Sequence, residues 1–201
     1  MIDNKPSTKT RIFNSALHLF ASKGVENASM RDIADSAGIN IASIYNHYTS
    51  KEQLVDACYD FFVEHHESAR LSEEIYKIIL QNGTKEEVIR IANEQFPLEP
   101  EENLVCSMTI LFSRIYIDAK ATEKYSEIIN NYLQFLKGYF ELGIELGRFE
   151  NFDVNKVSLL FLSAKLFAAQ SSTIHPETEL DLRLAQKEII LELINNIPFK
   201  Y

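Results

Sequence analysis

Six small or hydrogen-bonding residues lie within the eight positions from 40 to 47. Amide, hydroxyl and imidazole groups bond to base edges and phosphate oxygens, and an alanine methyl packs against the methyl group of thymine. This chemistry predicts a surface that reads a nucleic acid. The residues are Asn40, Ala42, Ser43, Tyr45, Asn46 and His47.

No residue pattern predicts catalysis. The chain has no GxSxG, HExxH, phosphate-cradling glycine loop or CxxC pair. His65 and His66 are adjacent in a helical pattern, so they project about 100° apart and do not readily share one metal ion. We therefore expect no enzyme, no catalytic residues, no metal and no cofactor.

Two short helices must position the hydrogen-bonding residues. Ile33, Ala34 and Ala37 form one narrow apolar stripe, and Ile41 and Ile44 begin another; all five are expected to face inward. Gly38 lies between the stripes, where a chain reversal favours glycine. Short helices joined by such a turn form a helix-turn-helix, in which the second helix enters the major groove. On spacing alone, a helical corner in any α protein is the alternative.

The third helix of this segment is expected to begin at Lys51. Its N-terminal amides and its lysine together form an anion site. Capping boxes are predicted at Ser29/Asp32, Ser50/Gln53 and Thr84/Glu87, and Gly147 is expected to end a long helix. No alternating strand pattern is found, so the predicted fold is all-α with about nine or ten helices.

The composition is that of an ordinary globular protein, with 46% apolar and 24% charged residues. The net charge is −9, but residues 1–50 carry five Lys/Arg against four Asp/Glu. This segment therefore carries +1 and the rest of the chain −10, so the acidity does not exclude a DNA partner. No apolar run is long enough for a membrane span or typical of a secretory signal. We expect a cytoplasmic protein whose Cys58 and Cys106 are buried thiols.

The stretch from Arg11 to Leu54 resembles the N-terminal domain of the TetR family of bacterial transcriptional regulators. The resemblance depends on the block IFNSALHLFASKGVENASMRDIADSAGINIASIYNHYTSKEQL, with its Ile33-Ala34-x-x-Ala37-Gly38 turn and the Tyr45-x-His47-Tyr48 segment. It implies a helix-turn-helix DNA-binding domain over residues 1–52 and a helical effector-binding and dimerisation domain over 53–201. It also implies a homodimer on double-stranded DNA with a palindromic operator, released by a small-molecule effector. The DNA contacts carried over are Ser29, Arg31, Asn40, Ser43, Tyr45, Asn46, His47 and Lys51.

The segment departs from many relatives at Ala42-Ser43, where they have a basic residue and a glycine, and at Tyr48, where they have phenylalanine. The first departure removes a cation that reads guanine. We therefore predict an operator that is read through Asn46, Tyr45, Ser43 and methyl contacts and is rich in A·T pairs.

Two apolar stripes near the C-terminus have two interpretations. They either cover the chain's own core, or pair with a second copy in a four-helix bundle, which the family resemblance favours. The predicted dimer interface consists of Leu160, Phe161, Ala164, Phe167, Leu184, Leu191 and Ile194.

Aromatic residues are frequent in the central helices, where they either pack in a core or line an apolar cavity. Arg114 and His65 have two interpretations. They either orient a polar group of a ligand in this cavity, or Arg114 forms a salt bridge and His65 is solvated. The predicted effector contacts are Phe61, His65, Phe112, Arg114 and Tyr116.

Two hypotheses about function therefore stand. The first is a ligand-responsive dimeric repressor. The second is a DNA-anchored adaptor or co-activator whose acidic body binds another protein without a small effector. An enclosed aromatic pocket favours the repressor, and an exposed apolar patch favours the adaptor.

Overall fold

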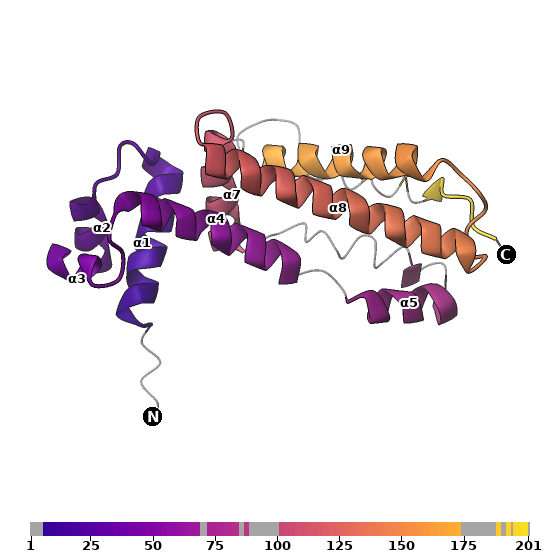
Figure 1. Ribbon diagram of the computed structural model, residues 1–201, viewed down its shortest axis with the longest axis horizontal. Coiled ribbons are helices and arrows are strands. Elements are labelled where there is room, and N and C mark those ends of the chain that lie inside the picture. The colour runs from indigo at the N-terminus through magenta and orange to yellow at the C-terminus, as the bar shows by residue number, and fades with distance from the viewer. Residues whose placement is uncertain are drawn as a thin grey trace, which may run out of the picture. The chain divides into compact units, whose positions relative to one another are not determined.

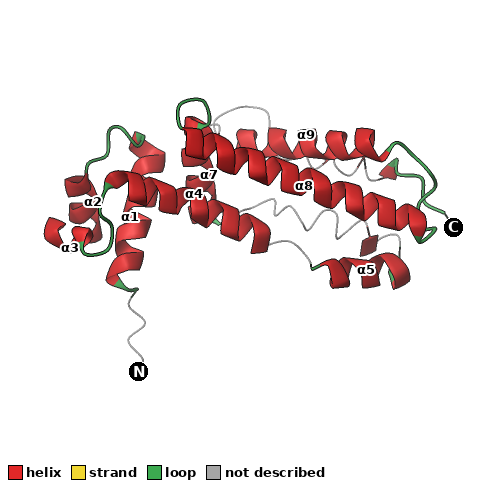
Figure 2. Cartoon of the chain, in the orientation of Figure 1, coloured by secondary structure: helices red, strands yellow, loops and turns green. Residues whose placement is uncertain are grey.

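The computed structural model describes residues 6–68, 72–84, 87–88, 101–173, 188–189, 192–193 and 195–200. Regular structure in these ranges is helical, which confirms the predicted all-α class (Figure 1, Figure 2). The helices are α1 (Thr8–Lys23), α2 (Met30–Ala37), α3 (Ile41–Tyr45), α4 (Lys51–Ser68), α5 (Glu73–Asn82), α7 (Glu102–Arg114), α8 (Ala119–Glu145) and α9 (Val154–Thr173).

These eight described helices are slightly fewer than the nine or ten expected. The last predicted helix, around 179–197, falls largely outside the described residues. Among the helices of the described ranges, none combines the length and the hydrophobicity needed to cross a bilayer.

Helix boundaries follow the predicted caps closely. At the start of α2, the Ser29 hydroxyl accepts a hydrogen bond from the amide of Asp32, and the Asp32 carboxylate accepts one from the amide of Ser29 at 2.8 Å. The same reciprocal pair forms between Thr84 and Glu87. Gly147, with φ of 71°, follows the end of α8 as predicted. Local polar chemistry therefore sets where these helices begin and end.

The apolar helical pattern of residues 103–119 predicts a single helix, and this prediction is wrong at its C-terminal end. α7 stops at Arg114, and the amides of Ile117 and Asp118 both donate to the Arg114 carbonyl in a turn. The Asp118 carboxylate then accepts a hydrogen bond from the amide of Lys120 at 2.9 Å, so α8 begins at Ala119. Asp118 separates the two helices because it caps the second one.

The described chain divides into two compact units, one of residues 1–66 and 100–125, the other of residues 67–99 and 126–201. In the first unit, α2 packs against α1 and α3 against α2, and α1 also contacts α7 (Figure 1). Its buried side chains include Ile12, Leu17, Phe20, Ile33, Ile44, Leu54, Tyr59 and Leu111. The predicted boundary between residues 52 and 53 stays a prediction.

The second unit has an aromatic core. Phe149 lies 4.9 Å from Phe199 and 6.3 Å from Phe140 between ring centroids, and the rings are tilted against one another. Tyr76, which is partly buried, meets Phe135 edge to face at 5.7 Å. The aromatic residues of this unit therefore pack against one another, as the core interpretation expects.

Candidate nucleic-acid interface

The turn between α2 and α3 is fixed by backbone geometry. Gly38 is in the left-handed region, at φ 63° and ψ 42°, and its amide donates to the carbonyls of Ala34 and Asp35. The amide of Ile39 also donates to the Ala34 carbonyl at 3.0 Å. Asn40 then caps α3 by accepting a hydrogen bond from the amide of Ala42 at 2.9 Å. The two short helices therefore form the predicted helix-turn-helix.

Arg11 stabilises this turn, and the sequence analysis did not identify it. From α1, its guanidinium donates to the carbonyl of Ala37 and, at 3.3 Å, to that of Gly38. A cation at the C-terminal end of α2 also interacts favourably with the helix dipole. No local pattern reveals this contact, because Arg11 is 26 residues before Ala37 in the chain.

One side of α3 is buried and the other is exposed. Ile44 is fully buried, whereas the Tyr45 side chain is 51% exposed. Ser43 is partly buried, and the other exposed candidates are Asn40, Ala42, Asn46 and His47. Ile41, the first residue of α3, is 36% exposed and is therefore not buried as predicted. The predicted reading residues are thus open to a partner.

Two DNA contacts, Ser29 and Arg31, are predicted at the start of α2, and their side chains have different surroundings. Arg31 is exposed. The Ser29 hydroxyl instead donates to the Asp32 carboxylate at 2.6 Å while accepting from the Asp32 amide. The hydrogen bonds that the Asp32 carboxylate accepts from the Ser29 hydroxyl and the Ser29 amide lower the pKa of Asp32. The structure therefore gives the Ser29 side chain a capping role.

Lys51 begins α4 as predicted, and its ammonium contacts the loop that precedes α2. Its Nζ donates to the carbonyl of Val25 at 2.9 Å and to that of Ala28 at 3.4 Å. The predicted DNA contact of Lys51 stays a prediction. Lys51 joins the start of α4 to the loop that precedes α2.

Among the predicted effector residues, Arg114 forms the salt bridge that was one of its two sequence-based interpretations. It pairs with Glu26 and, at 3.4 Å, with Asp118. The Tyr116 side chain is 91% exposed in the turn after α7, so it lines no enclosed site in the described structure. Phe112 instead meets Tyr125 edge to face at 5.5 Å.

Phe61 and His65 stack on each other along α4, with 3.8 Å between ring centroids. They line an open depression of about 450 Å³, together with Phe13, Tyr48 and other described residues of the first unit. Phe112, Arg114 and Tyr116 are not among its lining residues. The five predicted effector contacts are therefore not brought into one cavity.

The predicted dimer residues on α9 separate into two groups. Leu160 is 44% exposed and Phe167 46% exposed, seven residues apart on one face of the helix, and Ala164 between them is partly buried. Phe161 is only 2% exposed and lies in the core of its own unit, so we remove it from the predicted interface. Leu184, Leu191 and Ile194 lie outside the described residues.

Comparison with known proteins matches the segment that contains this site. The family model of bacterial regulatory proteins of the tetR family matches residues 12–58. The transcriptional repressor KstR2 of Rhodococcus jostii is 44% identical over 52 residues, which are 26% of either chain. The transcriptional regulator UidR of Escherichia coli is 32% identical over 102 residues, 48% of this chain and 50% of UidR. The chain thus spans only a quarter to a half of these two relatives.

The fold extends the similarity along the whole chain. A crystal structure of AibR in complex with isovaleryl coenzyme A and operator DNA is similar with a TM-score of 0.64 and 19% identity. The match covers 95% of this chain and 98% of AibR. At this identity the similarity shows the fold alone, and the match to the tetR family model is confined to residues 12–58.

Proposed function

We propose that the chain is a DNA-binding transcriptional repressor of the TetR family, because residues 12–58 match the model of that family of bacterial regulatory proteins and the similar KstR2 and UidR are a transcriptional repressor and a transcriptional regulator. It acts as a homodimer on a palindromic operator, and a small-molecule effector releases it from the DNA. It binds DNA rather than catalysing a reaction, and it acts in the cytoplasm, where bacterial DNA lies.

The observation that supports this proposal most strongly is the exposed side of α3. Tyr45 ends a short helix that is held by the buried Ile44, and both Tyr45 and the following residue, Asn46, are exposed. A helix fixed in this way enters the major groove without further ordering, which favours tight binding. The proposed contacts are Arg31, Asn40, Ser43, Tyr45, Asn46 and His47, with Ser29 and Lys51 assigned to holding the motif together.

The homodimer is supported by the apolar face of α9. Leu160 and Phe167 leave nearly half of their side-chain surface exposed in the single chain. A two-fold interface on this face removes that surface from water and presents two copies of α3 to one duplex. Half-sites about 34 Å apart, or a multiple of that distance, follow from this symmetry.

The effector is supported by the family and by AibR, whose structure contains both isovaleryl coenzyme A and operator DNA. We propose a small organic effector for this chain without assigning its chemistry. An effector that prefers a conformation that does not fit DNA, by roughly 1–3 kcal/mol, lowers operator affinity about 5- to 150-fold.

One observation favours the adaptor as a second candidate. Tyr116 and Ile117 are 91% and 72% exposed and lie next to each other in the turn between α7 and α8. Large apolar side chains held outward by a hydrogen-bonded turn are typical of protein-binding surfaces. A protein that bound this turn would make the chain an adaptor on DNA.

Selection of duplexes by the full-length protein tests the proposal. A random region of about 30 base pairs accommodates two half-sites one or two helical turns apart. The proposal predicts an enriched palindrome rich in A·T pairs. Failure to enrich any duplex, or enrichment of a site without symmetry, would contradict it.

The selected duplex then tests α3. Asn46→Ala removes an exposed amide that pairs with adenine, and should weaken binding by about 1–3 kcal/mol in fluorescence anisotropy. Gln134→Ala removes an exposed amide from α8 and serves as the control, with unchanged affinity expected. Equal affinity of Asn46→Ala and wild type would count against α3 as the reading helix.

A further inference from the structure

The loop between α1 and α2 is fixed at two points. Lys51 donates to its carbonyls at Val25 and Ala28, and the Glu26 carboxylate pairs with Arg114. Ser29, at the end of this loop, is the cap at which α2 begins. The position of the loop therefore determines where the helix-turn-helix starts.

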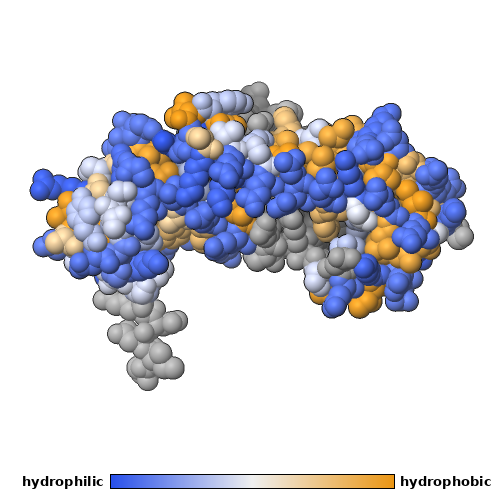
Figure 3. All heavy atoms as spheres, viewed as in Figure 1, coloured by the Kyte–Doolittle hydropathy of each residue, from blue (hydrophilic) through white to orange (hydrophobic). Residues whose placement is uncertain are grey.

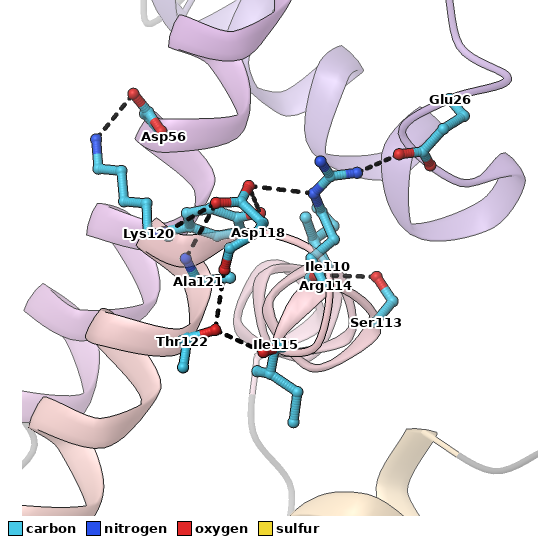
Figure 4. Close-up of polar contacts among 11 residues, drawn as sticks. Glu26, Asp56, Ile110, Ser113, Arg114, Ile115, Asp118, Lys120, Ala121 and Thr122 are labelled. Carbon is cyan, nitrogen blue, oxygen red and sulfur yellow. Dashed lines mark hydrogen bonds and ion pairs between the residues drawn. The ribbon is translucent and has the colours of Figure 1, made fainter.

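Arg114 joins this loop to the turn between α7 and α8. Figure 4 shows its guanidinium between Glu26 on one side and Asp118 on the other. The Arg114 side chain is 17% exposed and that of Asp118 22%, so water screens this pair less than it screens Glu26, which is 67% exposed. The same arginine is thus anchored at the α7–α8 turn and reaches outward to the loop.

Contacts from α4 stabilise the anchored end. The hydroxyl of the fully buried Tyr59 donates to the Asp118 carboxylate at 3.0 Å. Lys120 pairs with Asp56 at 2.8 Å (Figure 4), and Lys124 pairs with Asp60 at 3.2 Å. Three residues on one side of α4 therefore hold the first turns of α8 in place.

We propose that Arg114 is a positioning residue for DNA recognition: through its pair with Glu26, it holds the loop before α2 in the arrangement that binds DNA. The inference rests on the proposed function, because positioning matters only if α2 and α3 meet a duplex. Neither residue is among the proposed DNA contacts. When the pair is lost, the loop samples more arrangements, and the fraction of molecules competent to bind falls.

Simple electrostatics predicts the opposite effect. Glu26 is an acid in the DNA-binding unit, so its neutralisation alone would reduce repulsion from phosphates and tighten binding. If the carboxylate anchors the loop, its neutralisation weakens binding. The sign of the change therefore distinguishes an anchor from an ordinary surface charge.

The test measures the affinity of E26Q, R114Q, R114K and the double variant E26Q/R114Q for the duplex selected by the wild type. D35N is the control, since it removes an exposed acid from α2 and should bind at least as tightly as wild type. We expect E26Q and R114Q each to weaken binding about fivefold, the effect of a favourable ion pair with one exposed partner. The double variant should be no weaker than R114Q, and R114K should retain most of the affinity.

Two results would overturn the inference. One is E26Q binding as tightly as wild type or D35N, and the other is a double variant whose loss is the sum of the two single losses. E26Q is suited to the first test because the Glu26 side chain is exposed, so its substitution does not disturb the core.

Amide hydrogen exchange without DNA separates this inference from the proposed function. Residues 24–29 should exchange faster in both E26Q and R114Q than in wild type or D35N. Unchanged exchange in both variants would overturn the inference whatever the DNA result. If the wild type enriches no duplex, the proposed function fails, while faster exchange would still show that Arg114 positions the loop.

Discussion

Three cations of the first unit join segments that are separated in the sequence. Arg11 donates to the end of α2, Lys51 to the loop before α2, and Arg114 pairs with carboxylates on either side of it. The polar groups exposed in and around α3, at Asn40, Tyr45, Asn46 and His47, are amide, phenol and imidazole side chains. These three cations therefore stabilise the helix-turn-helix, while the proposed DNA contacts are neutral hydrogen-bonding groups and the exposed Arg31.

Lys51→Met tests this division of roles. The substitution leaves the carbonyls of Val25 and Ala28 without their cation, so we expect the free energy of unfolding to fall by about 1–2 kcal/mol in urea titrations. The salt dependence of DNA binding should not change. Lys23→Met, at an exposed position of α1, is the matched control for loss of a cation. If the slope of log affinity against log salt concentration fell by about one in Lys51→Met and not in the control, Lys51 would be a phosphate contact instead.

Asp118 makes a pH-dependent contribution to stability. Burial alone would raise its pKa, but hydrogen bonds from Tyr59, the backbone of α8 and Arg114 lower it overall. A lowered folded-state pKa means that the carboxylate stabilises the fold at pH values above its unfolded pKa, and that this contribution is lost as pH falls through the folded value.

We therefore expect Asp118→Asn to be less stable than wild type at pH 7, with the difference shrinking as the pH falls below about 4, near the ordinary pKa of aspartate. Urea unfolding at a series of pH values measures it. A difference that stays constant from neutral to acidic pH would rule out the ionised carboxylate as the stabilising group.

At the scale of the element, the sequence predicts what depends on neighbouring residues. The Ser29/Asp32 capping box and the turn at Gly38 involve residues at most five positions apart, and both are confirmed. The wrong end of α7 has the same local origin, because Asp118 was not recognised as the cap of α8. Arg11 at the end of α2 and Arg114 at Glu26 join residues 26 and 88 positions apart, and no local pattern predicts such pairs.

Two glycines of α8 give a matched test of packing. A Cβ at Gly143 would lie 2.1 Å from the ring of Phe149, which is enclosed by other aromatic rings, whereas a Cβ at Gly138 would meet no heavy atom within 4 Å. Gly143→Ala should lower the free energy of unfolding by about 1–3 kcal/mol through overpacking. Gly138→Ala should raise it by about 0.5–1 kcal/mol, the usual gain in a helix.

Thermal or urea unfolding of the two variants measures both effects. Because both exchange glycine for alanine in one helix, the difference in sign isolates the contact with Phe149. Equal stabilisation by the two substitutions would mean that the aromatic core is loose enough to admit a methyl group.

For the whole molecule, recognition of a palindromic operator requires a two-fold symmetric homodimer. Phe167 is 46% exposed and lies on the same face of α9 as Leu160. Phe167→Asp places a charge on this face, and we expect it to shift the protein to monomers in sedimentation at micromolar concentration. Asn155→Asp adds a charge at an exposed position on another side of α9 and should leave the assembly unchanged.

A wild type that sediments as a monomer would contradict the dimer directly. If the wild type is a dimer and Phe167→Asp remains one, another surface forms the interface, and α9 is not responsible for it.

The central claim is that two copies of α3 enter the major groove of one duplex. Hydroxyl-radical footprinting of the selected duplex with full-length wild-type protein tests it most directly. We expect two symmetric protected patches on one face of the DNA, with centres one helical turn of about 34 Å apart or a multiple of it. A single patch, or protection spread evenly along both faces, would contradict it.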